Sequence, residues 1–201
     1  NEKETNLALE KIRNSSFNIT KISTKRVRRN PMPPFTTSTL QQEASNKLGF
    51  GASRTMRIAQ KLYEGINIGS ETTGLITYMR TDGVQLSTQA IDELRSEITN
   101  LHGKEYIPQS PRIYKSKAAN AQEAHEAIRP TAISRNPKSM SSYLDAEQLK
   151  LYELIWRRTI SSQMQSAELD ETVADISNEN KSIVFRANGS QVRFPGFFIY
   201  R

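Results

Sequence analysis

The sequence predicts an α+β chain, mainly α, in which a winged-helix-like helical domain is inserted into a discontinuous β-rich domain. Apolar residues recur at helical spacing through the middle of the chain, from about residue 38 to 164. At both ends apolar and polar residues alternate instead, with the period of two that indicates strands. Because strand signals flank the helical block, we expect the β-rich part to be built from two separate segments.

The N-terminal segment predicts one short helix and one strand. Leu9 and Ile12 would share one side of a helix at residues 6–13. Residues 17–20 alternate between apolar and polar side chains, as a half-buried strand does. The proline cluster at 31–34 interrupts this signal because proline lacks a backbone donor.

A helix is expected directly after the prolines. Ser38 and Gln41 have the spacing of a capping box, which predicts that Ser38 caps this helix. Gly49 stands where a C-terminal cap belongs. The apolar side of the helix would be formed by Leu40, Ala44 and Leu48.

A second helix at 54–64 and a strand at 75–80 complete the order of a winged helix-turn-helix. Arg54, Arg57 and Lys61 would lie along one face of the second helix. Such a basic stripe suits DNA, although solvated helices often carry one too.

Three further helices are predicted. Ser87 would cap the first, Asn120 would cap a short one that ends at Pro130, and Asp145 would begin the longest with a capping box. The apolar face of the first would contain Ile91, Leu94, Ile98 and Leu101, and that of the longest Leu151, Leu154, Ile155 and Trp156.

Beyond the last helix the apolar period changes to two. Residues 173–176, 183–185 and 192–194 predict three short strands. Turns are expected between them at 178–180 and 188–189, where asparagine and glycine gather.

Length and composition bound the function. The 201 residues suit one large domain or two small ones, at roughly 100–200 residues per domain. No apolar stretch approaches the roughly 18 residues that span a membrane, so we expect no membrane partner and a cytoplasmic location. The absence of cysteine excludes disulfides, cysteine-ligated zinc and thiol catalysis. Because the chain starts without Met and stops inside an apolar run, we interpret it as part of a longer protein.

The charge is basic and uneven. The net charge is +7, and no acidic residue occurs between Lys11 and Gln42, a stretch rich in lysine and arginine. Such a stretch commonly binds polyphosphate, because each neutralised phosphate releases counterions. A solvated basic edge is the alternative explanation.

Residues 77–82 form the first candidate site. On an extended backbone Tyr78, Arg80 and Asp82 would share one face. A phenol has a pKa of about 10 and becomes a useful nucleophile when a nearby cation favours the phenolate. Arg80 could also hold a phosphate oxygen, with Asp82 orienting it. On spacing alone, an ordinary strand with a packed tyrosine and a surface ion pair explains the pattern better.

Residues 125–130 form the second candidate site. His125 and Arg129 stand four apart and would share a helix face. A histidine can pass a proton to a leaving alkoxide while an arginine holds the phosphate. By spacing alone, an ordinary pair of solvent-exposed side chains without a function is the commoner explanation.

Three runs of the chain resemble the bacterial type IA DNA topoisomerases, in that family's order. They are PFTTSTLQQEA at 34–44, LITYMRTD at 75–82 and HEAIRPT at 125–131. The resemblance continues through LYELIWR at 151–157 and is most specific over 34–156.

The resemblance implies roles for the candidate residues. Tyr78 matches the family's nucleophile, which attacks one DNA strand and keeps its 5′-phosphate as a phosphotyrosine. Arg80 matches the arginine that positions the scissile phosphate, and His125 would contact a DNA phosphate or assist proton transfer. The residues expected to support the site or bind DNA are Asp82, Arg129, Arg54, Arg57, Lys61, Thr39 and Gln42.

The resemblance also implies a domain arrangement and a reaction. Residues 35–164 would be the winged-helix-like domain that bears the tyrosine. Residues 1–34 and 165–201 would belong to a β-rich gate domain that arches over the strand-passage hole. The whole enzyme would relax negatively supercoiled DNA without ATP, because the covalent intermediate stores the phosphodiester energy.

The family's acidic metal-binding domain, of the Toprim fold, should precede this segment. No Asp-x-Asp pair occurs here, so we expect no metal site in this chain and Mg²⁺ bound by the preceding domain. The expected partners are a single-stranded segment of negatively supercoiled DNA and the rest of the same polypeptide, namely the Toprim and remaining gate domains. The chain alone is expected to bind DNA weakly and not to relax supercoils.

Two departures from the family pattern stand out. Gly83 follows the Thr-Asp pair, where the family usually has serine, and the loop at 66–74 is longer than its commonest version. Two other functions remain open: a non-enzymatic winged-helix DNA-binding module, and a structural or protein-interaction domain.

Overall fold

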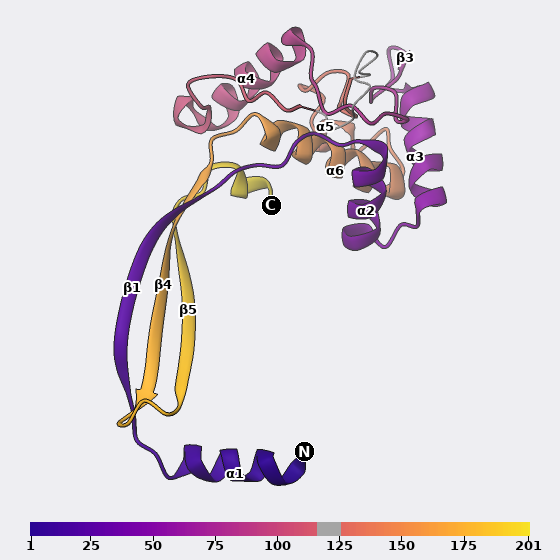
Figure 1. The fold of residues 1–201 in the computed structure, drawn as a ribbon. Coiled ribbons are helices and arrows are strands. Elements are labelled where there is room, and N and C mark those ends of the chain that lie inside the picture. The colour runs from indigo at the N-terminus through magenta and orange to yellow at the C-terminus, as the bar shows by residue number, and fades with distance from the viewer. Residues whose placement is uncertain (116–125) are drawn as a thin grey trace. The chain divides into compact units, whose positions relative to one another are not determined.

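The computed structural model describes residues 1–115 and 126–201, which divide into two compact units (Figure 1). One, the strand unit, comprises Asn1–Arg29 and Ala167–Pro195. The other, the helical unit, comprises Asn30–Ser166 and Gly196–Arg201. The expected mixture of helix and strand is confirmed. Residues 196–201 lie with the helices, although the sequence placed them with the strands.

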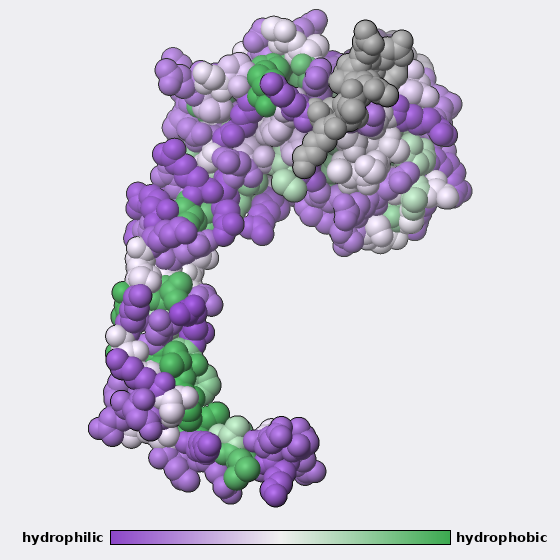
Figure 2. Space-filling model, in the orientation of Figure 1, coloured by the Kyte–Doolittle hydropathy of each residue, from purple (hydrophilic) through white to green (hydrophobic). Residues whose placement is uncertain are grey.

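The strand unit contains α1 (Glu2–Arg13) and an antiparallel sheet of β1 (Phe17–Arg29), β4 (Ala167–Asn178) and β5 (Val184–Phe194). The strand order is β1-β4-β5, so segments from the two ends of the chain meet along β4 (Figure 1). The predicted first helix and first strand are both present, and both are longer than the sequence pattern indicated. Apolar residues remain exposed on this unit, as Figure 2 shows in green.

One of the two predicted C-terminal turns is wrong. The chain does turn between Asn178 and Ile183, whose backbone groups bond at 3.2 Å. At Asn188-Gly189, however, β5 continues, and Gly189 pairs with Thr172 of β4. A two-residue hairpin turn there would need positive φ angles, and neither residue has one.

The basic stretch of β1 is largely paired across the sheet. Arg26 meets Asp170 at 2.9 Å, and Arg28 meets Glu168 at 3.0 Å. Arg29 reaches Glu171 at 2.5 Å. Exposed pairs of this kind stabilise a fold only weakly, but they lower the charge that the sheet offers to a polyanion. The polyphosphate interpretation of this stretch therefore loses support.

The helical unit is built from short elements around one core. Its elements are α2 (Thr37–Leu48), α3 (Ala52–Glu64), β2 (Ile66–Asn67), β3 (Thr72–Thr73), α4 (Thr88–His102), η1 (Lys104–Tyr106), α5 (Pro137–Met140), α6 (Ala146–Ser162) and η3 (Gly196–Tyr200). The core gathers fully buried side chains from several of them, among them Leu40 of α2, Leu62 of α3, Ile98 of α4 and Leu151 of α6. No helix in the described ranges is long and apolar enough to cross a membrane.

Of the three predicted N-terminal helix caps that lie in the described residues, two are confirmed. Ser87 caps α4 and Asp145 begins α6 with a capping box, as expected. The α2 cap is Thr36 rather than Ser38, because Thr36 and Thr39 exchange reciprocal side-chain and backbone bonds. Thr36 also has the extended backbone that a cap requires.

Two predicted elements are wrong. Residues 75–80 form no strand, and only Ile76 makes an isolated bridge, to Pro130. Glu126 to Pro130 form no helix; the chain there is extended, with Ile128 bridged to Phe35. The residue before a proline avoids helical geometry, which explains the second error. The rest of that predicted helix, from Asn120, lies outside the described residues.

The turn that begins η3 generates the first prediction. Gly196 has φ +47°, and a Cβ there would lie 2.5 Å from the Gln165 carbonyl oxygen. Gly196→Ala should lower the free energy of unfolding by about 1–3 kcal/mol. Urea unfolding followed by Trp156 fluorescence reports it, since the Tyr200 ring lies 5.4 Å from that of Trp156.

Gly189→Ala is the matched control. A Cβ at Gly189 meets nothing within 4 Å, and its φ is not positive. We expect this variant to unfold within about 0.5 kcal/mol of the wild type. If both variants lost the same amount of unfolding free energy, the steric explanation for Gly196 would be contradicted.

Candidate active site

The candidate nucleophile lies on an irregular loop, residues 74–83, which we call the tyrosine loop. Side chains alternate along it: Tyr78 is 43% exposed and Arg80 and Asp82 are exposed, whereas Met79 and Thr81 are buried. The predicted common face of the three polar residues therefore exists without a strand. Burial of every second side chain produces it.

Thr37, the first residue of α2, holds one end of the tyrosine loop. Its hydroxyl donates to the Met79 carbonyl oxygen at 2.7 Å and accepts from the Thr81 amide at 2.8 Å. Its own amide donates to the Thr81 carbonyl oxygen at 2.9 Å. The first helical residues have no partner inside the helix, so this amide is free to bind the loop.

The segment 127–131 holds the other end. The Thr77 amide donates to the Arg129 carbonyl oxygen at 2.9 Å, and the Arg129 amide donates to the Thr77 hydroxyl at 3.0 Å. That hydroxyl donates in turn to the Ala127 carbonyl oxygen at 2.7 Å. The backbone on both sides of Tyr78 is thereby fixed.

The loop begins in close contact with the end of α3. The Leu75 amide donates to the Leu62 carbonyl oxygen at 2.7 Å. A Cβ on Gly74 would lie 2.5 Å from the Tyr63 carbonyl oxygen, so only glycine fits here. The Tyr63 ring meets the Tyr78 ring edge-on, with centroids 5.3 Å apart. Tyr78 is therefore supported from α3 as well.

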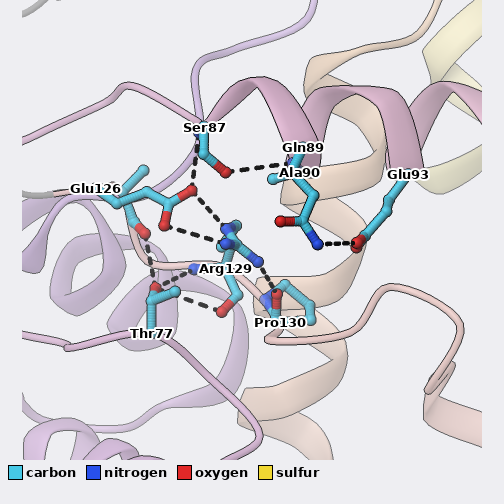
Figure 3. Close-up of polar contacts among 9 residues, drawn as sticks. Thr77, Ser87, Gln89, Ala90, Glu93, Glu126, Arg129 and Pro130 are labelled. Carbon is cyan, nitrogen blue, oxygen red and sulfur yellow. Dashed lines mark hydrogen bonds and ion pairs between the residues drawn. The ribbon is translucent and has the colours of Figure 1, made fainter.

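A second polar cluster joins segment 126–130 to the start of α4 (Figure 3). Arg129 donates to both carboxylate oxygens of Glu126, at 2.7 and 3.1 Å, and to the Pro130 carbonyl oxygen at 2.9 Å. The Ser87 amide donates to the same carboxylate at 2.9 Å. Burial alone would raise the pKa of Glu126, but the bonds from Arg129 and Ser87 outweigh it and lower the pKa.

Sequence inspection missed Glu126, although it is the second residue of the HEAIRPT run. It predicted that Arg129 binds DNA or supports the site, and in the structure the Arg129 guanidinium pairs with Glu126. The expected helix face shared by His125 and Arg129 does not form on the extended backbone, and His125 itself lies outside the described residues.

Arg80 and Asp82 share a face but no contact. The structure records no ion pair or hydrogen bond between them, and none from Arg80 to any other residue that it describes. An orienting role of Asp82 toward Arg80 therefore has no contact in its favour. Gly83 is buried, and its amide donates to the Thr81 hydroxyl at 2.9 Å.

The remaining predicted residues lie on α2 and α3. Arg54, Arg57 and Lys61 form an exposed face of α3, but Arg54 pairs with Glu147. The Thr39 side chain forms part of the α2 capping box. A further predicted residue of α2, Gln42, is exposed. Across residues 1–115 and 126–201, no group of three or more His, Asp or Glu side chains could hold a metal ion.

Comparisons with known proteins agree over the whole chain. The profile of the DNA topoisomerase family matches residues 1–201. DNA topoisomerase 1 of Rickettsia felis is 55% identical over 202 residues, covering 100% of this chain and 26% of that protein. DNA topoisomerase 1 of Xylella fastidiosa (strain Temecula1) is 52% identical over 182 residues, which is 90% of this chain and 22% of that protein.

The fold gives the same result. The structure of full-length topoisomerase I from Thermotoga maritima matches with a TM-score of 0.84 at 36% identity, covering 96% of this chain and 31% of that one. Sequence and fold thus define one class of protein, the DNA topoisomerases. The chain belongs to the DNA topoisomerase family, and it spans about a quarter of the length of the curated relatives that it matches.

The Thr37 contacts generate a prediction. Thr37→Val keeps the side-chain shape but removes the hydroxyl bonds to Met79 and Thr81, so each of these buried residues loses a hydrogen-bond partner. Stability should fall by about 1–3 kcal/mol. Trypsin should also cut faster after the exposed Arg80, because the loop is released. Thr37→Ser keeps the hydroxyl and should behave like the wild type; an unchanged cleavage rate in the valine variant would refute the role.

The Glu126 cluster predicts a pH dependence. The folded protein lowers the pKa of Glu126, so its stabilisation is complete above the unfolded value of about 4.3 and is lost as the pH falls through the folded value. Glu126→Gln should therefore cost about 1–3 kcal/mol near neutral pH, with the difference from the wild type shrinking at acid pH.

Urea titrations at a series of pH values measure this difference. Glu93→Gln, on the exposed face of α4, is the control and should follow the wild type at every pH. A Glu126→Gln deficit that stays constant down to the acid limit would contradict the electrostatic explanation.

Proposed function

We propose that this chain is the part of a type IA DNA topoisomerase that carries the nucleophile, Tyr78. The whole enzyme would relax negatively supercoiled DNA by cutting one strand, passing another through the break and resealing it. One observation carries the proposal: Tyr78 is exposed on a backbone fixed from both sides, next to an exposed Arg80, in a member of this family.

The proposed chemistry needs one covalent exchange. The Tyr78 phenol oxygen attacks a phosphodiester phosphorus, the bond to the 3′ oxygen breaks, and the phenol proton ends on the released 3′-hydroxyl. A 5′-phosphotyrosine forms with no net change in the number of phosphoester bonds, so resealing is the reverse step. The energy of the broken bond is conserved, and ATP is not required.

Arg80 is suited to the phosphate. A guanidinium binds two oxygens of one phosphate and stabilises the charge that builds up during attack. Because no described residue pairs with it, Arg80 is available for this role. His125, by resemblance, would contact the phosphate or assist proton transfer to the leaving oxygen.

The rest of the reaction depends on other parts of the polypeptide. By the resemblance to the family, Mg²⁺ would act through acidic residues of a preceding Toprim domain. The strand unit would be part of the gate, and the helical unit the winged-helix-like domain. We also propose a cytoplasmic location, single-stranded DNA segments as substrate, and weak DNA binding without relaxation for this chain alone.

A second candidate function has one observation in its favour. Helices α2 and α3 are joined by a short turn and followed by the small β2–β3 ribbon, and α3 has an exposed basic face. A winged-helix module that binds DNA without cutting it would use these features. It gives no reason, however, for fixing Tyr78 and Arg80 side by side.

A chimera separates the two functions. This chain would replace the matching 202 residues of the Rickettsia felis relative, and the chimera would be mixed with labelled single-stranded DNA and Mg²⁺. A covalent protein–DNA band should appear on a denaturing gel and vanish in Tyr78→Phe. Arg80→Ala should slow its formation by about 10²–10³-fold.

Tyr63→Phe is the matched control, because it removes a neighbouring phenol and keeps the ring contact. It should retain the covalent band. A band that survives Tyr78→Phe would refute the proposed nucleophile, and DNA binding without any band would favour the binding module.

A further inference from the structure

A groove of about 340 Å³ runs along α2 in the helical unit. One wall is a polar stripe of α2 that includes Gln42 and Asn46, four residues apart. The lining also includes the apolar residues Met32, Pro33 and Val84, which we call the apolar wall. We call this the α2 groove. It combines flat apolar surface with hydrogen-bonding groups, as small-ligand sites do.

The charged groups of the α2 groove are already paired. Glu43 binds Lys47 at 2.9 Å and also pairs with Arg158. The Arg158 guanidinium lies 4.4 Å from the centre of the Phe35 ring. The two cations share one carboxylate, so the groove keeps a net charge of +1, which suits the backbone phosphate of a bound nucleotide.

The groove also contains two neutral side-chain amides. Gln42 and Asn46 are exposed, and the structure records no hydrogen bond from either to any residue that it describes. Each amide offers one acceptor and two donated hydrogens, the pattern that reads the edge of a nucleobase. The apolar wall, where Met32 is 63% exposed, can cover the flat face of the same base.

The groove lies next to the tyrosine loop along the chain. Val84 follows Asp82 by two residues, and the α2 stripe begins two residues after Thr37, which holds the loop. We propose that the α2 groove binds one nucleobase of the single strand near the cleaved phosphate, with Gln42 and Asn46 selecting the base. The inference rests on the proposed function for its placement on the substrate, and it assigns a cause for preferred cleavage positions.

Binding to defined strands tests the groove. This chain would be titrated into fluorescent single strands of equal length, made of dA, dC, dT or abasic nucleotides, at one fixed salt concentration. Affinities for the three bases should differ by about 5- to 150-fold, and the abasic strand should bind more weakly than the preferred base. The joint variant Gln42→Leu and Asn46→Leu should bind the three bases alike.

The control is Gln89→Leu with Asn100→Leu, the same residue types on an exposed face of α4 outside the groove. It should keep the wild-type base ranking, and thermal unfolding would verify that both double variants are folded. An unchanged ranking in the groove variant overturns the inference, as does equal binding of the abasic strand by the wild type.

The covalent band in the chimera distinguishes this inference from the proposed function. If the chimera gives a covalent band but the binding assay shows no base preference, the base-binding role of the α2 groove is refuted and the role of Tyr78 stands. If binding depends on the base and on Gln42 and Asn46 but no covalent band forms, the proposed role of Tyr78 is refuted. The α2 groove is then a binding site for single strands.

Discussion

The buried backbone of the tyrosine loop needs hydrogen-bond partners, and the loop has no sheet to supply them. An unpaired buried amide or carbonyl costs about as much as a lost hydrogen bond, so the helical unit has to provide substitutes. Thr37 and Thr77 do so with hydroxyls that both donate and accept. Three parts of the helical unit meet this need, since α2, α3 and the 127–131 segment each bring a partner to the loop.

Periodic and local features were predictable from the sequence, whereas features that depend on distant residues were not. The apolar face of α6 and the caps at Ser87 and Asp145 follow from spacing alone, and the structure has them. Residues 75–80 have β-branched and aromatic side chains, yet their partners are single bridges and hydroxyls rather than a neighbouring strand. Propensity could not show which partner the fold would supply.

In the candidate site, too, the local pattern was predictable and the contacts between distant residues were not. The common face of Tyr78, Arg80 and Asp82 followed from a period of two, which the burial pattern reproduces. The role of Glu126 could not be inferred, because its contacts with Ser87 and Arg129 exist only in three dimensions. The basic run in β1 was misleading for a related reason, since the carboxylates that offset it lie about 140 residues away in β4.

The position of Thr37 has a consequence for motion. It is at once the first residue of α2 and the residue that fixes Met79 and Thr81. Helix ends fray more readily than helix centres, and local opening proceeds in cooperative units. Fraying of the first turn of α2 would therefore free only the Met79–Thr81 end of the tyrosine loop, because Thr77 and Leu75 keep their bonds to Arg129 and Leu62. Because Met79 is buried in the core of the helical unit, any mobility that Tyr78 gains in this way is limited by the cost of exposing Met79.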